Sequence, residues 1–183
     1  MTSALSQFTF RLVKIDVDTL EVTVAFELPD GAQGIAFGPA PEVEVYCSSK
    51  PNSAGCLPAI DWTGHPSAWA HIGFEVTATN VRNQSPGFLV VGLNGRASMP
   101  FHGGTACVAG PWMFALPVDA GGSAPPVVDC TGTWTTDLNT WLYQNLPLRA
   151  GTELACQWWG RDPGLSGPDA AQLSDGLLLT LLP

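Results

Sequence analysis

Apolar and polar residues alternate along much of the chain, and this period of two predicts β-strands. The clearest case is LEVTVAFEL (20–28), in which every second residue from Leu20 to Leu28 is a large apolar side chain. QFTFRLVKI (7–15) is rich in aromatic and β-branched residues, and DVDT (16–19) has the composition of a turn. Residues 7–28 are therefore expected to form a β-hairpin.

Further short strands follow the same logic, and Gly, Pro, Asn and Ser separate nearly all of them. They are expected at 42–47, 73–81, 87–93, 105–109, 132–136, 153–159 and 176–182. Asp137 is a suitable N-cap for one short helix near 138–144. About nine short strands without alternating helices predict an all-β fold, a β-sandwich of which the jelly roll is one form.

We expect a single domain over residues 1–183. A two-stranded hairpin is only marginally stable alone, so the hairpin within residues 1–42 is expected to join the same sandwich as residues 43–183.

Composition narrows the classes of function. The 183 residues include 45% hydrophobic but only 13% charged residues, and the formal net charge is −9. An acidic chain lacks the basic face that nucleic acids and anionic membrane surfaces require. No apolar run approaches the ~18 residues of a membrane-spanning helix. The first residues lack the features of a signal peptide, so an extracellular location would require a signal sequence absent from this chain.

The five cysteines indicate whether the protein works in an oxidising or a reducing compartment. Cys47 and Cys56 flank the polar loop SSKPNSAG, and Cys107 and Cys130 flank a long Gly/Pro-rich connection. We predict the disulfides Cys47–Cys56 and Cys107–Cys130, although four cysteines allow three pairings. Disulfide bonds are typical of secreted proteins, so these cysteines favour an extracellular location. Cys156 lies in an apolar strand and is expected to be a buried free thiol.

The stretch ELACQWW (153–159) contains two adjacent tryptophans. Strand alternation places Trp158 on the face of Leu154 and Cys156, and Trp159 on the face of Glu153 and Gln157. Trp158 is therefore expected in the core and Trp159 at least partly outward. A competing interpretation is that the following loop covers Trp159 and that Arg161 and Asp162 form a structural ion pair.

The chain resembles an uncharacterised C-terminal domain of large secreted proteins from planctomycete-type bacteria. The resemblance covers roughly residues 43–183 and rests on YCSSKPNSAGC, DCTG and QWWGRDPG. It implies a secreted, disulfide-bearing terminal module with a binding, anchoring or sorting role. It implies no catalytic residue.

Seven tryptophans are a high number for this length, and exposed indoles stack on sugars. The candidate ligand-binding residues lie in loops or on the outward strand face: Trp62, Trp69, Trp112 and Trp159. We expect at least two of them to be substantially exposed. The sequence thus favours a non-catalytic extracellular module that binds a polysaccharide or a cell-surface protein. A self-associating structural subunit is an alternative.

An enzyme is the third alternative. His65, His71 and His102 are weak candidates for a metal site, because imidazole binds zinc and copper but no HxH or HExxH spacing occurs. Carboxylates for polysaccharide hydrolysis would come from Asp61, Glu75, Asp137, Glu153 or Asp162. No GxSxG motif is present. We expect no cofactor.

Overall fold

A computed structural model describes residues 10–15, 22–28 and 43–183. The chain divides into two compact units, residues 1–37 and 38–183. In the first, β1 (Phe10–Ile15) pairs antiparallel with β2 (Val22–Leu28), so the two strands of the expected hairpin are confirmed. The turn expected at 16–19 lies outside the described residues. That the hairpin joins the sandwich stays a prediction.

The second unit is an all-β sandwich, as the strand pattern predicted. Its largest sheet runs β10-β6-β12-β13-β3, with β9 also paired to β6. The strands are β3 (Val43–Tyr46), β6 (Pro86–Gly92), β9 (Met113–Phe114), β10 (Val118–Asp119), β12 (Glu153–Arg161) and β13 (Ala171–Thr180). A three-stranded sheet, β11-β5-β4, contains β4 (Ala59–Gly64), β5 (Phe74–Val81) and β11 (Gly132–Asp137).

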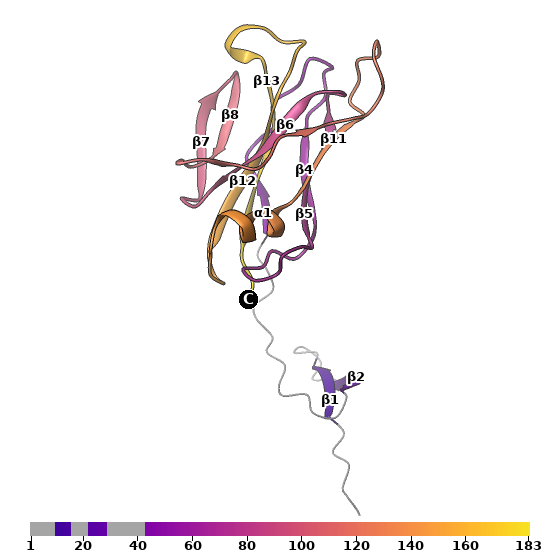
Figure 1. Ribbon diagram of the computed structural model, residues 1–183, viewed down its shortest axis with the longest axis vertical. Helices are drawn as coiled ribbons and strands as arrows, with labels where there is room; N and C mark the ends of the chain where they lie inside the picture. The colour runs from indigo at the N-terminus through magenta and orange to yellow at the C-terminus, as the bar shows by residue number, and fades with distance from the viewer. Residues whose placement is uncertain (1–9, 16–21, 29–42) are drawn as a thin grey trace, which may run out of the picture. The chain divides into compact units, whose positions relative to one another are not determined.

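A third layer covers the other face of the large sheet. It is the hairpin of β7 (Arg96–Phe101) and β8 (Gly104–Val108). Figure 1 shows β7 and β8 on one side of β6, β12 and β13, and β4, β5 and β11 on the other. Because both faces of the large sheet are covered, every residue of β12 except its two ends is buried.

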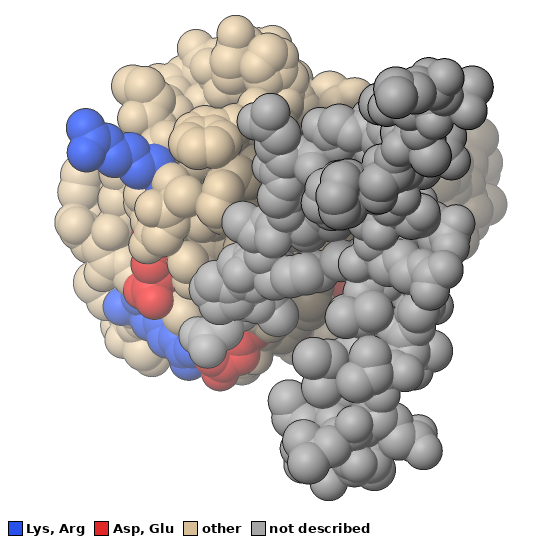
Figure 2. Space-filling model, turned by 90° about the horizontal axis from the view of Figure 1, so that it is seen from below, with Lys and Arg blue, Asp and Glu red and all other residues tan. Residues whose placement is uncertain are grey.

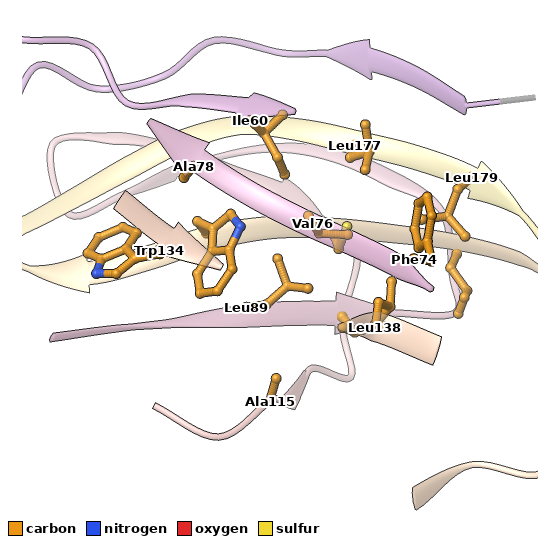
Figure 3. Packing of buried hydrophobic residues seen from close by; sticks show 14 of the residues in the cluster. Ile60, Phe74, Val76, Ala78, Leu89, Ala115, Trp134, Leu138, Leu177 and Leu179 are labelled. Carbon is orange, nitrogen blue, oxygen red and sulfur yellow. The ribbon is translucent and has the colours of Figure 1, made fainter. Parts of the chain in front are cut away.

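The main core lies between the large and the three-stranded sheets. Phe74 and Val76 of β5 face Leu89, Leu177 and other apolar residues of the large sheet (Figure 3). Trp158 is completely buried there, as predicted. Trp134 packs against the paired glycines Gly87 and Gly160, where a Cβ atom would come within 2.3 and 2.0 Å of the indole. This close approach requires glycine on both strands.

One α-helix, α1 (Leu138–Asn145), lies at one end of the sandwich (Figure 1). Asp137 caps it, since its side chain accepts a hydrogen bond from the Thr140 amide at 3.0 Å. This confirms both the helix and its predicted cap. Among the described residues, no helix has the length and apolar character needed to cross a membrane.

Four cysteines form two disulfides and Cys156 is a buried free thiol, but the predicted pairing is wrong. The bonds are Cys47–Cys107 and Cys56–Cys130, between residues 60 and 74 positions apart.

The fold explains both pairings. Gly176 of β13 lies beneath both Tyr46 and Cys107, so the end of β3 and strand β8 meet over the same point. At the other site, two segments dock on the end of β5 and the turn that follows it: Asn52 donates to the Asn80 carbonyl, and Asn83 bonds the backbone of Asp129. Cys56 and Cys130 are brought together by this shared turn.

Candidate functional site

The four candidate tryptophans differ in burial and do not share one surface. Trp69 is 69% exposed, whereas Trp159 is only 6% exposed. Trp62 and Trp112 are half-buried, Trp62 against the main core and Trp112 against the second cluster, which also contains Trp159. The expectation of at least two substantially exposed tryptophans is therefore wrong.

Trp159 does point away from Trp158, but the layer formed by β7 and β8 covers it. Phe101 stacks on its indole at a centroid distance of 4.3 Å, and Trp112 contacts its edge at 4.8 Å. Gln157, which shares the strand face that we expected to point at least partly outward, is fully buried beneath the same layer. The ion pair of Arg161 with Asp162, part of the competing interpretation, is absent from the described residues, in which Arg82 is the partner of Asp162 at 3.7 Å.

Trp69 lies on a loop that is firmly attached to the sandwich. The Ser67 hydroxyl accepts hydrogen bonds from the Trp69 and Ala70 amides at 3.1 and 3.0 Å. The Ala68 amide donates to the Leu182 carbonyl at 2.9 Å. Trp69 is therefore exposed without being on a loosely held loop.

The buried Asn139 of α1 fixes the two ends of this loop. Its side-chain oxygen accepts from the Ser67 amide at 3.0 Å, and its amide group donates to the carbonyls of His65 and Ile72. The hydroxyl of the next residue of the helix, Thr140, donates to the His71 carbonyl at 2.8 Å. Loop 65–72 is thus positioned by two adjacent helical side chains.

A hollow of about 260 Å³ lies between this loop and α1, and we call it the Trp69 hollow. Its lining residues are Ala68, Trp69, Tyr143, Leu146, Pro147 and Leu148. Tyr143 is 59% exposed, and His71 stacks on its ring at 3.6 Å. No charged side chain lines the hollow. Figure 2 views the sandwich from this end, and most of the described surface visible there belongs to residues other than Lys, Arg, Asp and Glu.

A second concavity, the aromatic cleft, opens beside the β7–β8 hairpin. It has a volume of about 300 Å³ and is lined by Phe88, Phe101, His102, Phe114, Trp159 and Arg161, with Gly160, Ala170 and Ala171 between them. Phe88 and Phe114 contact edge to face at 5.3 Å. The cleft thus brings together His102, a candidate metal ligand, and Trp159, a candidate ligand-binding residue.

The histidines do not converge. His71 stacks on Tyr143 of α1, whereas His102 lies at the tip of the β7–β8 hairpin with its Nδ1 bonded to the Pro168 carbonyl. Within residues 43–183, no group of three His, Cys, Asp or Glu side chains is arranged to hold a metal ion.

Two of the carboxylates considered for hydrolysis, Glu75 and Asp137, are paired across β5 and β11, and three of the five accept hydrogen bonds from structural partners. Asp137 caps α1 and also accepts from the Gly73 amide at 2.7 Å. Asp162 is buried and accepts from the Ser53 amide and hydroxyl at 2.6 Å. Asp61 accepts from the adjacent Trp62 amide. Glu75 and Glu153 are exposed, and none of the five lines the hollow or the cleft.

Cys156 does not form a reactive centre. Complete burial raises the pKa of its thiol far above the ordinary value, so the nucleophilic thiolate is strongly disfavoured.

Sequence reasoning identified Trp69 but not Tyr143 or Asn139. The relevant signal was present, since residues 139 and 143 are one turn apart and share a face of the predicted helix. What packs against that face depends on the tertiary fold.

Comparison of the chain with protein-family models, with curated proteins and with solved structures found no match.

Proposed function

We propose that this protein is a non-catalytic extracellular module that binds a polysaccharide at the Trp69 hollow. The observation that carries the proposal is a largely exposed indole on a loop fixed by Ser67 and Asn139. Exposing an indole forgoes up to a few kcal/mol of hydrophobic stabilisation, so a well-ordered exposed tryptophan favours a binding role.

The surroundings of Trp69 support an uncharged ligand. A sugar ring offers an apolar face for stacking and hydroxyl groups for hydrogen bonding, and Trp69 and Tyr143 provide aromatic surface with polar atoms at their edges. Since loop 65–72 is already ordered, little further conformational entropy is lost when a ligand binds. Two disulfides are consistent with an oxidising compartment, which supports the extracellular location.

The test is retention of the full chain on insoluble cellulose, chitin, xylan and mannan, with Trp69→Ala and Ile72→Ala as a matched pair. Ile72 is 73% exposed on the same loop but does not line the hollow. Loss of the indole contact should cost about 2 kcal/mol, or roughly 30-fold in Kd. Ile72→Ala should bind as the wild type does. Equal retention of all three proteins, or of none, would contradict the proposal.

A second copy of the chain is the competing occupant of this surface. Trp69, Ile72 and Tyr143 are among the most exposed large side chains, as expected of an interface. Sedimentation velocity over a range of concentrations separates the two cases. A dimer abolished by Trp69→Ala would favour the self-associating structural subunit.

A further inference from the structure

The aromatic cleft is a concavity of the described sandwich that is distinct from the Trp69 hollow, and polysaccharide binding at that hollow does not account for it. Four aromatic rings form its floor and walls: Phe88 from β6, Phe101 from β7, Phe114 from β9 and Trp159 from β12. Phe114 is 51% exposed, so part of this aromatic surface is open to solvent. A ligand can therefore bury apolar area there without rearranging the core.

Trp159 is fixed from below. Its indole N–H donates to the buried Gln157 side chain at 2.9 Å, and the same Gln157 oxygen accepts from the Cys107 amide at 2.9 Å. Cys107 is in turn joined to Cys47 by a disulfide. The Gln157 side chain thus links the floor to strand β8 by hydrogen bonds, and the disulfide attaches β8 to the residue that follows β3.

The hairpin tip beside the cleft is also well defined. His102 and Gly103 both have positive φ, 47° and 72°, between the paired residues Phe101 and Gly104, which is the two-residue turn that suits a twisted hairpin. The His102 ring is bonded through Nδ1 to the Pro168 carbonyl and contacts Phe101 edge to face at 4.1 Å. The imidazole therefore has a set position at the rim.

Arg161 is the arginine among the residues that line the cleft, and the exposed Asp169 carboxylate lies outside the lining, against Gly103 of the hairpin tip. Arg161 lines the cleft, is exposed, and forms no ion pair with any described residue. Of the other arginines of residues 43–183, Arg82 and Arg96 are paired with Asp162 and Glu44, whereas Arg149 forms no ion pair with a described residue. No carboxylate lines the cleft. A guanidinium that has no ion pair among the described residues and lies beside an apolar floor is suited to bind an anionic group of an apolar ligand.

We propose that the aromatic cleft binds a small apolar carboxylate, whose ring or hydrocarbon body lies on the four aromatic side chains while its carboxylate pairs with Arg161. The volume of about 300 Å³ is at the lower end of the range for small-molecule sites, about 300–1,000 Å³, and so fits one or two rings. The planar guanidinium presents two parallel N–H donors, which match a carboxylate. This site is separate from the Trp69 hollow and does not depend on polysaccharide binding.

Three probes of nearly equal shape and different charge test this proposal: 2-naphthoate, 2-naphthamide and 2-naphthylmethylammonium. Each is titrated into the ¹⁵N-labelled full chain while the indole N–H resonance of Trp159 is followed. The anion should produce a saturable shift with a Kd at least about tenfold lower than those of the other two probes, the effect expected of one charge-assisted hydrogen bond.

Three variants make the assignment specific. Arg161→Gln should remove the preference for the anion, and Phe114→Ala should weaken all three probes; Arg149→Gln, which neutralises an exposed arginine outside the cleft, should change neither. Equal affinity for the three probes overturns the proposal, as does a preference that survives Arg161→Gln. Absence of a saturable shift at millimolar probe, or a shift at Trp69 in place of Trp159, overturns it too.

Discussion

Gln157 connects the large sheet to the layer above it, and its replacement by leucine is a demanding test of the three-layered fold. The side chain is completely buried in the middle of β12. Its oxygen accepts from the Cys107 amide and the Trp159 indole, both at 2.9 Å. Its amide group donates to the carbonyls of Thr105 at 3.0 Å and Ser174 at 2.7 Å. Leucine has a similar size but makes none of these bonds.

The magnitude follows from the donors that Gln157→Leu leaves without a partner. A buried N–H group without an acceptor costs about 1–3 kcal/mol, and the Cys107 amide and Trp159 indole are two such groups. Allowing for the favourable burial of leucine in place of an amide, the free energy of unfolding should fall by about 3–4 kcal/mol. For a unit of this size, that corresponds to a decrease in Tm of roughly 6–16 °C.

Urea unfolding with the disulfides intact, followed by tryptophan fluorescence, measures the change. Gln144→Leu, at an exposed position of α1, is the matched control and should alter stability by less than about 0.5 kcal/mol. If Gln157→Leu also lost less than about 1 kcal/mol, the hydrogen bonds would contribute little and the argument that Gln157 holds the β7–β8 layer would fail.

Three further predictions concern single side chains. Trp158→Ala should cost about 3–5 kcal/mol in urea unfolding because the indole is fully buried, whereas Trp69→Ala should stay within about 0.5 kcal/mol of the wild type. The Cys156 thiol should not react with a thiol reagent at pH 8 until urea unfolds the chain, since burial raises its pKa; rapid labelling of native protein would contradict this. Burial also raises the pKa of Asp175 in the folded state. The stability that the protonated Asp175 contributes is therefore fully present below the pKa of about 3.9 of an unfolded aspartate, and it is lost as the pH rises through the pKa in the folded state. Asp175→Asn keeps an oxygen to accept the Ile60 amide, which lies at 2.7 Å, and should gain stability relative to the wild type across that rise in pH; parallel pH profiles in thermal melting would refute the assignment.

Local signals predicted much of the fold. The strands at 73–81 and 87–93, the helix at 138–144 and the Asp137 cap depend on neighbouring residues, and each is present within one or two positions. The outer strand β7 (Arg96–Phe101) was harder to predict from the sequence. It contains Pro100, and its burial does not alternate regularly, so the period of two that identifies a strand is missing.

The errors about Trp159, Gln157 and Cys107 have a common cause in the third layer. Alternation in β12 correctly separated Trp158 from Trp159, but a period of two cannot show whether the second face meets water or another pair of strands. The same layer carries Cys107 to Cys47, which no local loop argument could reveal. The Trp69 hollow was predictable only in part. The sequence indicated an exposed tryptophan in a loop, but it could not show that Tyr143 lies beside Trp69, because that depends on how α1 packs.

The most direct test of polysaccharide binding at the Trp69 hollow uses the indole N–H resonances of the ¹⁵N-labelled full chain. Trp69→Phe assigns one of them, and soluble oligosaccharides from cellulose, chitin, xylan and mannan are titrated in turn. The proposal predicts that one series shifts the Trp69 resonance saturably and leaves those of the buried Trp134 and Trp158 unchanged. Shifts confined to other tryptophans, or no shift with any of the four series, would contradict it.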